Sequence, residues 1–159
     1  MQVQLNYTDL YAVVERSLSI IAKRSTDDKG NLLFDNITLG SRETELIYDY
    51  FRSAITSIAT DLRQYVTQFT LSATGFNMTI TLYDDANPQL QATILQAIKD
   101  YIVAFALYSW FTISAPRIYE KYLGDANIFR GYLIGQVFHR QRPQSMPDPL
   151  APRTDPSDT

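Results

Sequence analysis

Near residue 67 the hydrophobic period of the chain changes from that of a helix to that of a strand, and this change constrains the fold more than any other feature. Over residues 42–66, apolar residues recur every three or four positions, which is the period of an amphipathic helix. Over residues 69–83, they alternate with polar residues on both sides of Gly75, which is the period of two strands joined by a turn. An isolated hairpin is marginal in water, so we expect its apolar face to lie on helices or on a neighbouring subunit.

Three further helices are predicted, over residues of about 9–24, 88–113 and 116–139. Thr8 is a candidate cap for the first, and Pro88 suits the first position of the third. Pro116 disfavours helical geometry at the preceding residue and therefore separates the last two helices. The second half of 88–113 is apolar nearly all round, which is typical of the most buried element.

The two ends of the chain differ in character from its middle. Val3, Leu5 and Tyr7 alternate with polar residues, which is compatible with a short extended arm before the first helix. Residues 143–159 hold five of the seven prolines and few apolar groups, so we expect a flexible, proline-rich tail. The predicted fold class is mainly α: a four-helix bundle-like domain over 1–142 with one inserted β-hairpin, followed by this tail.

Membrane and targeting segments are not expected. The first residues lack the basic and then apolar pattern of a signal peptide. The most apolar stretch, Tyr101–Ile113, is thirteen residues long, whereas a helix needs about 20 to cross a bilayer. A buried core helix in a soluble protein is the interpretation.

Composition argues against catalysis and against a bound metal or cofactor. The chain has no cysteine and one histidine, which excludes thiolate and His-rich metal sites within one chain. No phosphate-binding loop or hydrolase motif is present. Asp84 and Asp85 fit turn and capping roles, and a formal net charge of −3 gives no general attraction to nucleic acid.

Aromatic residues are in excess, with eleven Tyr, eight Phe and one Trp. Core packing is the ordinary explanation, although tyrosines also dominate the energetics of protein–protein contacts. Tyr48, Tyr83, Tyr108 and Tyr132 do not fit the helical stripes, so whether they face the core or another subunit stays open.

Three segments, in this order, resemble the small head–tail connector (adaptor, or head-completion) proteins of tailed bacteriophages and prophages. They are SRETELIYDYFRSAITSIATDLRQYV, PQLQATILQAIKDYIVAFALYSWFTIS and YEKYLGDANIFRGYLIGQVFHRQRP. The L-Y-x-W-F stretch, followed by Y-x-x-Y and R-x-R-P, is similar to connector-like proteins from phages of Bacteroidetes hosts. The match covers roughly Leu39–Pro143 and rests on element order and loose local patterns.

The resemblance implies a non-enzymatic virion protein that forms a homo-oligomeric ring, dodecameric if the family holds, under the portal. Its partners would be the portal protein and the neighbouring tail component. It would assemble in the bacterial cytoplasm and sit near the DNA channel without specific nucleic-acid binding. The hairpin and the start of the tail would make the contacts, through Phe69, Leu71, Phe76, Met78, Ile80, His139, Arg140, Arg142 and Pro143.

Other interpretations stay open at this point. A tail terminator or another small virion joint could carry the same pattern. The chain could instead be a soluble cellular helical adaptor that recruits a protein partner. A small enzyme using Asp84, Asp85 or Glu120 ranks last, because it needs carboxylates that converge in a pocket.

Overall fold

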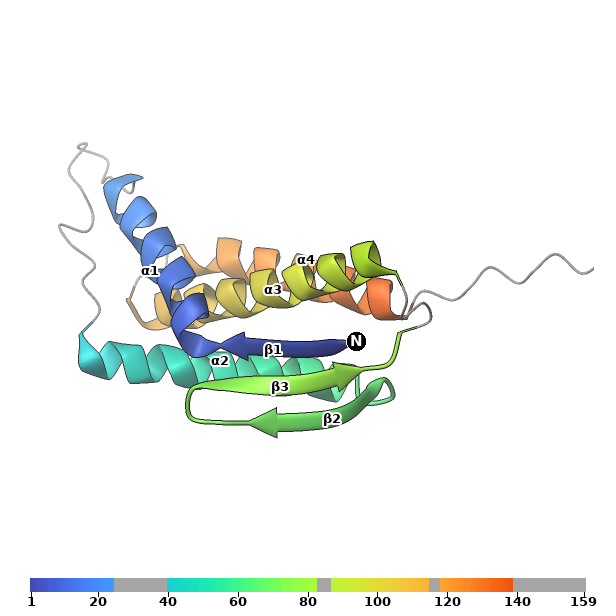
Figure 1. The fold of residues 1–159 in the computed structure, drawn as a ribbon. Coiled ribbons are helices and arrows are strands. Elements are labelled where there is room, and N and C mark those ends of the chain that lie inside the picture. The colour runs from blue at the N-terminus through green and yellow to red at the C-terminus, as the bar shows by residue number, and fades with distance from the viewer. Residues whose placement is uncertain (25–39, 83–86, 115–117, 139–159) are drawn as a thin grey trace, which may run out of the picture.

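A computed structural model describes residues 1–24, 40–82, 87–114 and 118–138 (Figure 1). It contains four helices and a three-stranded antiparallel sheet, which confirms the predicted mainly α class. In chain order the elements are β1 (Gln2–Asn6), α1 (Tyr7–Arg24), α2 (Ser41–Asp61), β2 (Val66–Leu71), β3 (Gly75–Ile80), α3 (Pro88–Ser114) and α4 (Tyr119–Val137).

The sheet has the order β1-β3-β2, so the first strand of the chain pairs with the third. The N-terminal alternation is therefore a strand and not a free arm. Val3 lies opposite Met78 and Leu5 opposite Phe76, and the Met1 ammonium donates a 2.8 Å hydrogen bond to the Ile80 carbonyl. The third strand gives the hairpin the extra pairing that an isolated hairpin lacks.

Gly75 begins β3, opposite Asn6 at the end of β1. A Cβ atom added there would lie 2.3 Å from the backbone oxygen of Leu5, far inside van der Waals contact. The turn before it is closed by the Ser72 N–H, which donates to the Gly75 carbonyl at 2.9 Å. Glycine is needed here because the backbone of β1 lies so close. The sequence pattern placed Gly75 in a turn but did not predict this contact with β1.

Helix α2 ends at Asp61, five residues before the apolar stripe does. The predicted boundary at 66 is too late because sheet pairing takes the last residues of the stripe. Leu62–Tyr65 form a turn, and the Tyr65 carbonyl accepts a 2.8 Å hydrogen bond from the Thr81 N–H. Val66 then pairs with Ile80 as the first residue of β2.

The core lies between the sheet, α2 and the α3–α4 pair, with α1 crossing one end (Figure 1). Helix α3 packs against all three other helices, and Ile98, Ile102 and Phe111 are fully buried. Its second half is less enclosed than predicted, because Phe105 and Trp110 are only half-buried and Ile113 is 71% exposed.

By length and composition α3 could cross a membrane, since one 18-residue window has a mean hydropathy of 1.3. The whole helix, at 27 residues, is longer than its thirteen-residue apolar stretch Tyr101–Ile113. Half of that window is buried inside the protein, as in a core helix, which passes the same test.

Candidate interaction surface

Strand β2 forms one edge of the sheet, and its outer side has no strand beside it among the residues described (Figure 1). The Ser72 N–H donates a hydrogen bond to the Gly75 carbonyl, so Ser72 faces β3. Thr70 and Gln68, two and four residues earlier, face β3 in the same way, opposite Asn77 and Thr79. Antiparallel strands alternate the direction of their backbone groups. The N–H and C=O groups of Phe69 and Leu71 therefore point away from β3, out of the sheet.

The apolar face of the sheet extends past its helical cover at this edge. Phe69 and Leu71 lie opposite Met78 and Phe76 and share their face. Met78 and Phe76 are buried, whereas Phe69 is 36% and Leu71 39% exposed. Beside them, a shallow groove of about 440 Å³ runs between β2 and α2, lined by Thr56, Ala59, Thr60, Arg63, Val66 and Phe69.

Charge does not protect this edge. Residues 64–83 contain no Asp, Glu, Lys, Arg or His, and β2 contains no proline. Edge strands are commonly guarded by charges, prolines or bulges. The one such device here is a register shift between Val66 and Gln68, so the half of β2 from Gln68 to Leu71 is unguarded.

The other edge of the sheet differs, because helices flank β1. Leu5 of β1 lines a groove of about 530 Å³ together with residues of α1, α3 and α4. This groove has an apolar floor that includes Leu10 and Leu107. Asp9, Asp100, Asp125 and Lys99 also line it. Burial, and next the Asp125 carboxylate, raise the pKa of Tyr122, which lines the same groove.

The structure separates the nine residues that the resemblance assigned to partner contacts. Phe76, Met78 and Ile80 are at most 2% exposed and belong to the core of this chain, so they are not surface residues. Phe69 and Leu71 are exposed and adjacent on one edge. His139, Arg140, Arg142 and Pro143 lie outside the described residues.

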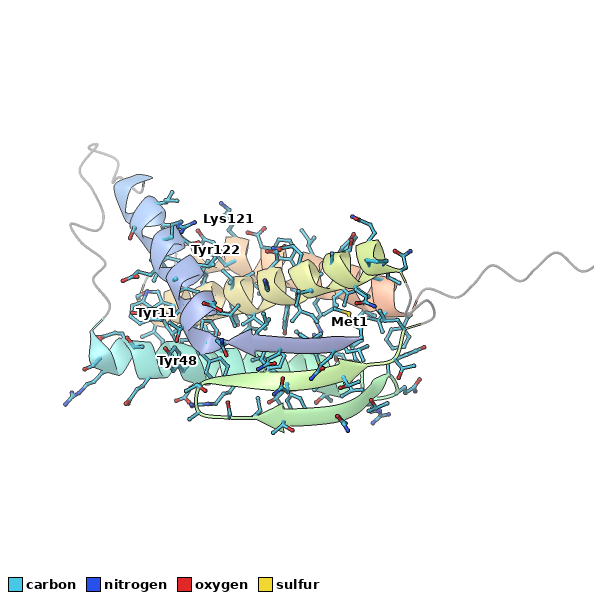
Figure 2. The ribbon with its side chains drawn as sticks, in the orientation of Figure 1. Met1, Tyr11, Tyr48, Lys121 and Tyr122 are labelled. Atoms are coloured by element: carbon cyan, nitrogen blue, oxygen red, sulfur yellow. The ribbon has the colours of Figure 1, made fainter. Side chains whose placement is uncertain are left out.

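Two of the four tyrosines left unassigned by the sequence pack within the chain. Tyr48 contacts Tyr7, Tyr11 and Phe51 at centroid distances of 5.4 to 6.1 Å, and Figure 2 shows Tyr11 and Tyr48 near the base of α1. Tyr108 lies between Phe105 and Tyr119. Tyr132 of α4 is 49% exposed, and Tyr83 lies outside the described residues.

A second exposed face lies on α4, and the sequence had pointed only to its Tyr132. Ile128 and Tyr132 are 68% and 49% exposed. A Cβ atom added at Gly124, Gly131 or Gly135 would meet nothing within 4 Å beyond the neighbouring backbone of α4 itself, among the residues that the structure describes. The glycine spacing is readable in the sequence, but it was not used there as a signal of a contact face.

The described residues contain no cluster of metal-ligating side chains. No three His, Cys, Asp or Glu side chains in that part of the chain are placed to hold a metal ion. Glu120 is exposed in the first turn of α4, and Asp84 and Asp85 lie outside the described residues.

Comparison of the chain with protein-family models, with curated proteins and with solved structures finds no match in any of the three.

Proposed function

We propose that this chain is a non-enzymatic structural subunit of a phage virion, which assembles with copies of itself and joins the portal to the tail. The observation that carries the proposal is the unguarded edge of β2. There, exposed Phe69 and Leu71 stand beside backbone groups that point out of the sheet. The resemblance to head–tail connectors supplies the biological setting.

An edge of this kind is unfavourable in a protein that works alone. Its free backbone groups and apolar side chains form a template for another chain, which is why single-chain proteins block such edges. A subunit of a permanent assembly has no need to block an edge that a partner covers. The exposed Ile128 and Tyr132 on α4 offer a second contact surface, separate from the β2 edge.

Co-purification from phage lysate tests the proposal. The tag belongs at the C-terminal end, because the Met1 ammonium is bonded to the Ile80 carbonyl within the sheet. We expect gradient-purified particles to carry the tagged chain together with portal and tail proteins. Leu71→Asp should reduce its incorporation, because the substitution charges the unguarded edge.

Asn77→Asp is the matched control, since it places the same charge on the exposed face of the central strand. Loss of incorporation with Leu71→Asp but not with Asn77→Asp supports an assembly role for the edge. Absence of the chain from particles, with only host proteins recovered, would contradict the proposal.

The second candidate is a cellular adaptor, and the groove between α1, α3 and α4 favours it. Its apolar floor and surplus of carboxylates over Lys99 would suit a basic amphipathic helix of a partner. Recovery of host proteins alone in the experiment above is the result that this candidate expects.

A further inference from the structure

We propose that β2 pairs with β2 of a second copy of this chain, antiparallel and about a two-fold axis through Thr70. The two three-stranded sheets then become one six-stranded sheet. The inference goes beyond the proposed function, since it concerns the purified chain and holds whether or not that chain is a virion protein.

The backbone of β2 determines the register of this pairing. Its outward N–H and C=O groups belong to Phe69 and Leu71. In an antiparallel pair, two opposite residues that both point toward the partner exchange two hydrogen bonds. Placing Phe69 opposite Leu71 of the second copy satisfies all of these groups, and it leaves Thr70 opposite itself on the axis.

The side chains agree with the same register. On the apolar face, Phe69 would lie against Leu71 of the second copy, twice over, and cover the two side chains that the monomer leaves exposed. On the outer face, Thr70 would meet Thr70. Gln68 would meet Ser72, another exposed polar residue.

The absence of charged residues makes β2 compatible with pairing to its own copy. At a two-fold axis a charged residue faces its own copy, so a strand with an edge lysine or glutamate would repel itself. Residues 64–83 are uncharged, and the nearest described charge, on Arg63, precedes β2. Arg63 also lines the groove beside Phe69, but it lies outside the paired residues 68–72 and so does not face its own copy.

Two other occupants fit this edge less well. The first is the β1 edge of a second copy. That edge is less open than the β2 edge, because Leu5 of β1 lines a groove together with residues of α1, α3 and α4. The segment 143–159 holds five prolines, which lack the N–H that strand pairing needs. The contact proposed here is isologous, so within a larger assembly it would join subunits across a two-fold axis.

Disulfide trapping is the sharpest test, because the chain has no cysteine of its own. Thr70→Cys would place two thiols opposite each other at a non-hydrogen-bonded pair. The Cα atoms there are about 4.5 Å apart, within the range that a disulfide spans. We expect the purified variant to form a disulfide-linked dimer under mild oxidation. The control Asn77→Cys, exposed on the central strand, should stay monomeric on non-reducing gels.

Charges introduced at the two-fold axis test the same geometry without a covalent bond. In sedimentation velocity, Thr70→Lys alone and Thr70→Glu alone should each weaken dimerisation about five-fold. A mixture of the two should recover a mixed dimer, and Asn77→Lys should leave the wild-type equilibrium unchanged. Circular dichroism and melting curves that match the wild type show that the variants fold.

Three results would overturn the inference. The first is a wild-type chain that stays monomeric up to about 100 μM. The second is a dimer that Thr70→Cys does not trap. The third is a mixture of Thr70→Lys and Thr70→Glu that associates no better than either variant alone.

Discussion

At the scale of single residues, Tyr7 combines a well-packed ring with an unsatisfied hydroxyl. The side chain is fully buried, and its ring lies 5.4 Å from Tyr48 and 5.9 Å from Phe51. The hydroxyl oxygen is buried and makes no hydrogen bond of ordinary geometry with the described residues, although the Arg52 side chain lies close enough to affect its pKa. Burial raises the pKa of Tyr7, and the charge of nearby Arg52 opposes that rise.

Tyr7→Phe should therefore raise the free energy of unfolding by about 1 kcal/mol in urea denaturation, because it removes a buried polar group without a partner. The matched variant is Tyr11→Phe. The Tyr11 hydroxyl accepts a 3.1 Å hydrogen bond from Thr44 Oγ1, so this variant should lose stability instead. A loss with Tyr7→Phe would show that the buried hydroxyl has a partner in solution.

The same tyrosine makes stability depend on pH in the alkaline range. Its pKa is raised above the ordinary value of 10.0 in the folded state, so the unfolded chain ionises first as pH rises. Ionisation of Tyr7 therefore leaves the free energy of unfolding unchanged below pH 10 and lowers it as the pH rises above that value. Tyr7→Phe should lose less of its free energy of unfolding between about pH 9 and about pH 12 than the wild type, as measured by urea denaturation at each pH. Some loss should remain, because burial also raises the pKa values of Tyr50 and Tyr122.

At the scale of elements, two glycines predict opposite effects of one added methyl group. At Gly75 a Cβ would collide with the Leu5 carbonyl, so Gly75→Ala should cost about 1–3 kcal/mol by forcing β1 and β3 apart. At Gly135 on α4 a Cβ meets nothing within 4 Å. Gly135→Ala should therefore stabilise the isolated chain by about 0.5–1 kcal/mol through helix propensity.

Thermal unfolding of the two variants beside the wild type measures both effects. An unchanged melting temperature for Gly75→Ala would mean that β1 does not approach the hairpin turn so closely. If Gly135→Ala is more stable yet assembles poorly, the exposed face of α4 around Gly135 is a contact between chains.

Periodicity predicted most of the elements, because local pattern determines whether a segment is a helix or a strand. It predicted α2, α3 and the hairpin, and it assigned Phe69 and Leu71 to the correct face. It could not predict which strand Val3 and Leu5 would pair with, since a short alternation carries no information about a partner far along the chain. Nor could it show that the helices stop short of covering Phe69, because the burial of that side chain depends on where α2 lies against the sheet.

At the scale of the whole molecule, one ion pair ties α4 to the end of α2. Arg130 Nε lies 2.6 Å from Asp61 Oδ2, and its Nη2 lies 2.7 Å from Oδ1. Asp61 is the last residue of α2, where a negative charge is unfavourable next to the helix dipole. The hydrogen bonds to Asp61 raise the pKa of Arg130 and so favour its charged form.

Arg130→Ala should lower the free energy of unfolding by about 1 kcal/mol, a modest value because the arginine is 42% exposed. Arg130→Lys should recover only part, since an ammonium lacks the two-pronged geometry. A double-mutant cycle with Asp61→Asn measures the coupling directly. Additive losses in that cycle would show that the pair does not connect the two helices energetically.

The strand order β1-β3-β2 also has a consequence during synthesis. Met1 and Ile80, which are hydrogen-bonded in the sheet, stand 79 positions apart in the chain. At about 5–20 residues per second, β1 leaves the ribosome about 4–16 s before the strand that will pair with it. Throughout that time Val3 and Leu5 have no sheet to join, and the hairpin can close without them. The nascent chain therefore completes its sheet from the middle outward, with its oldest strand added last.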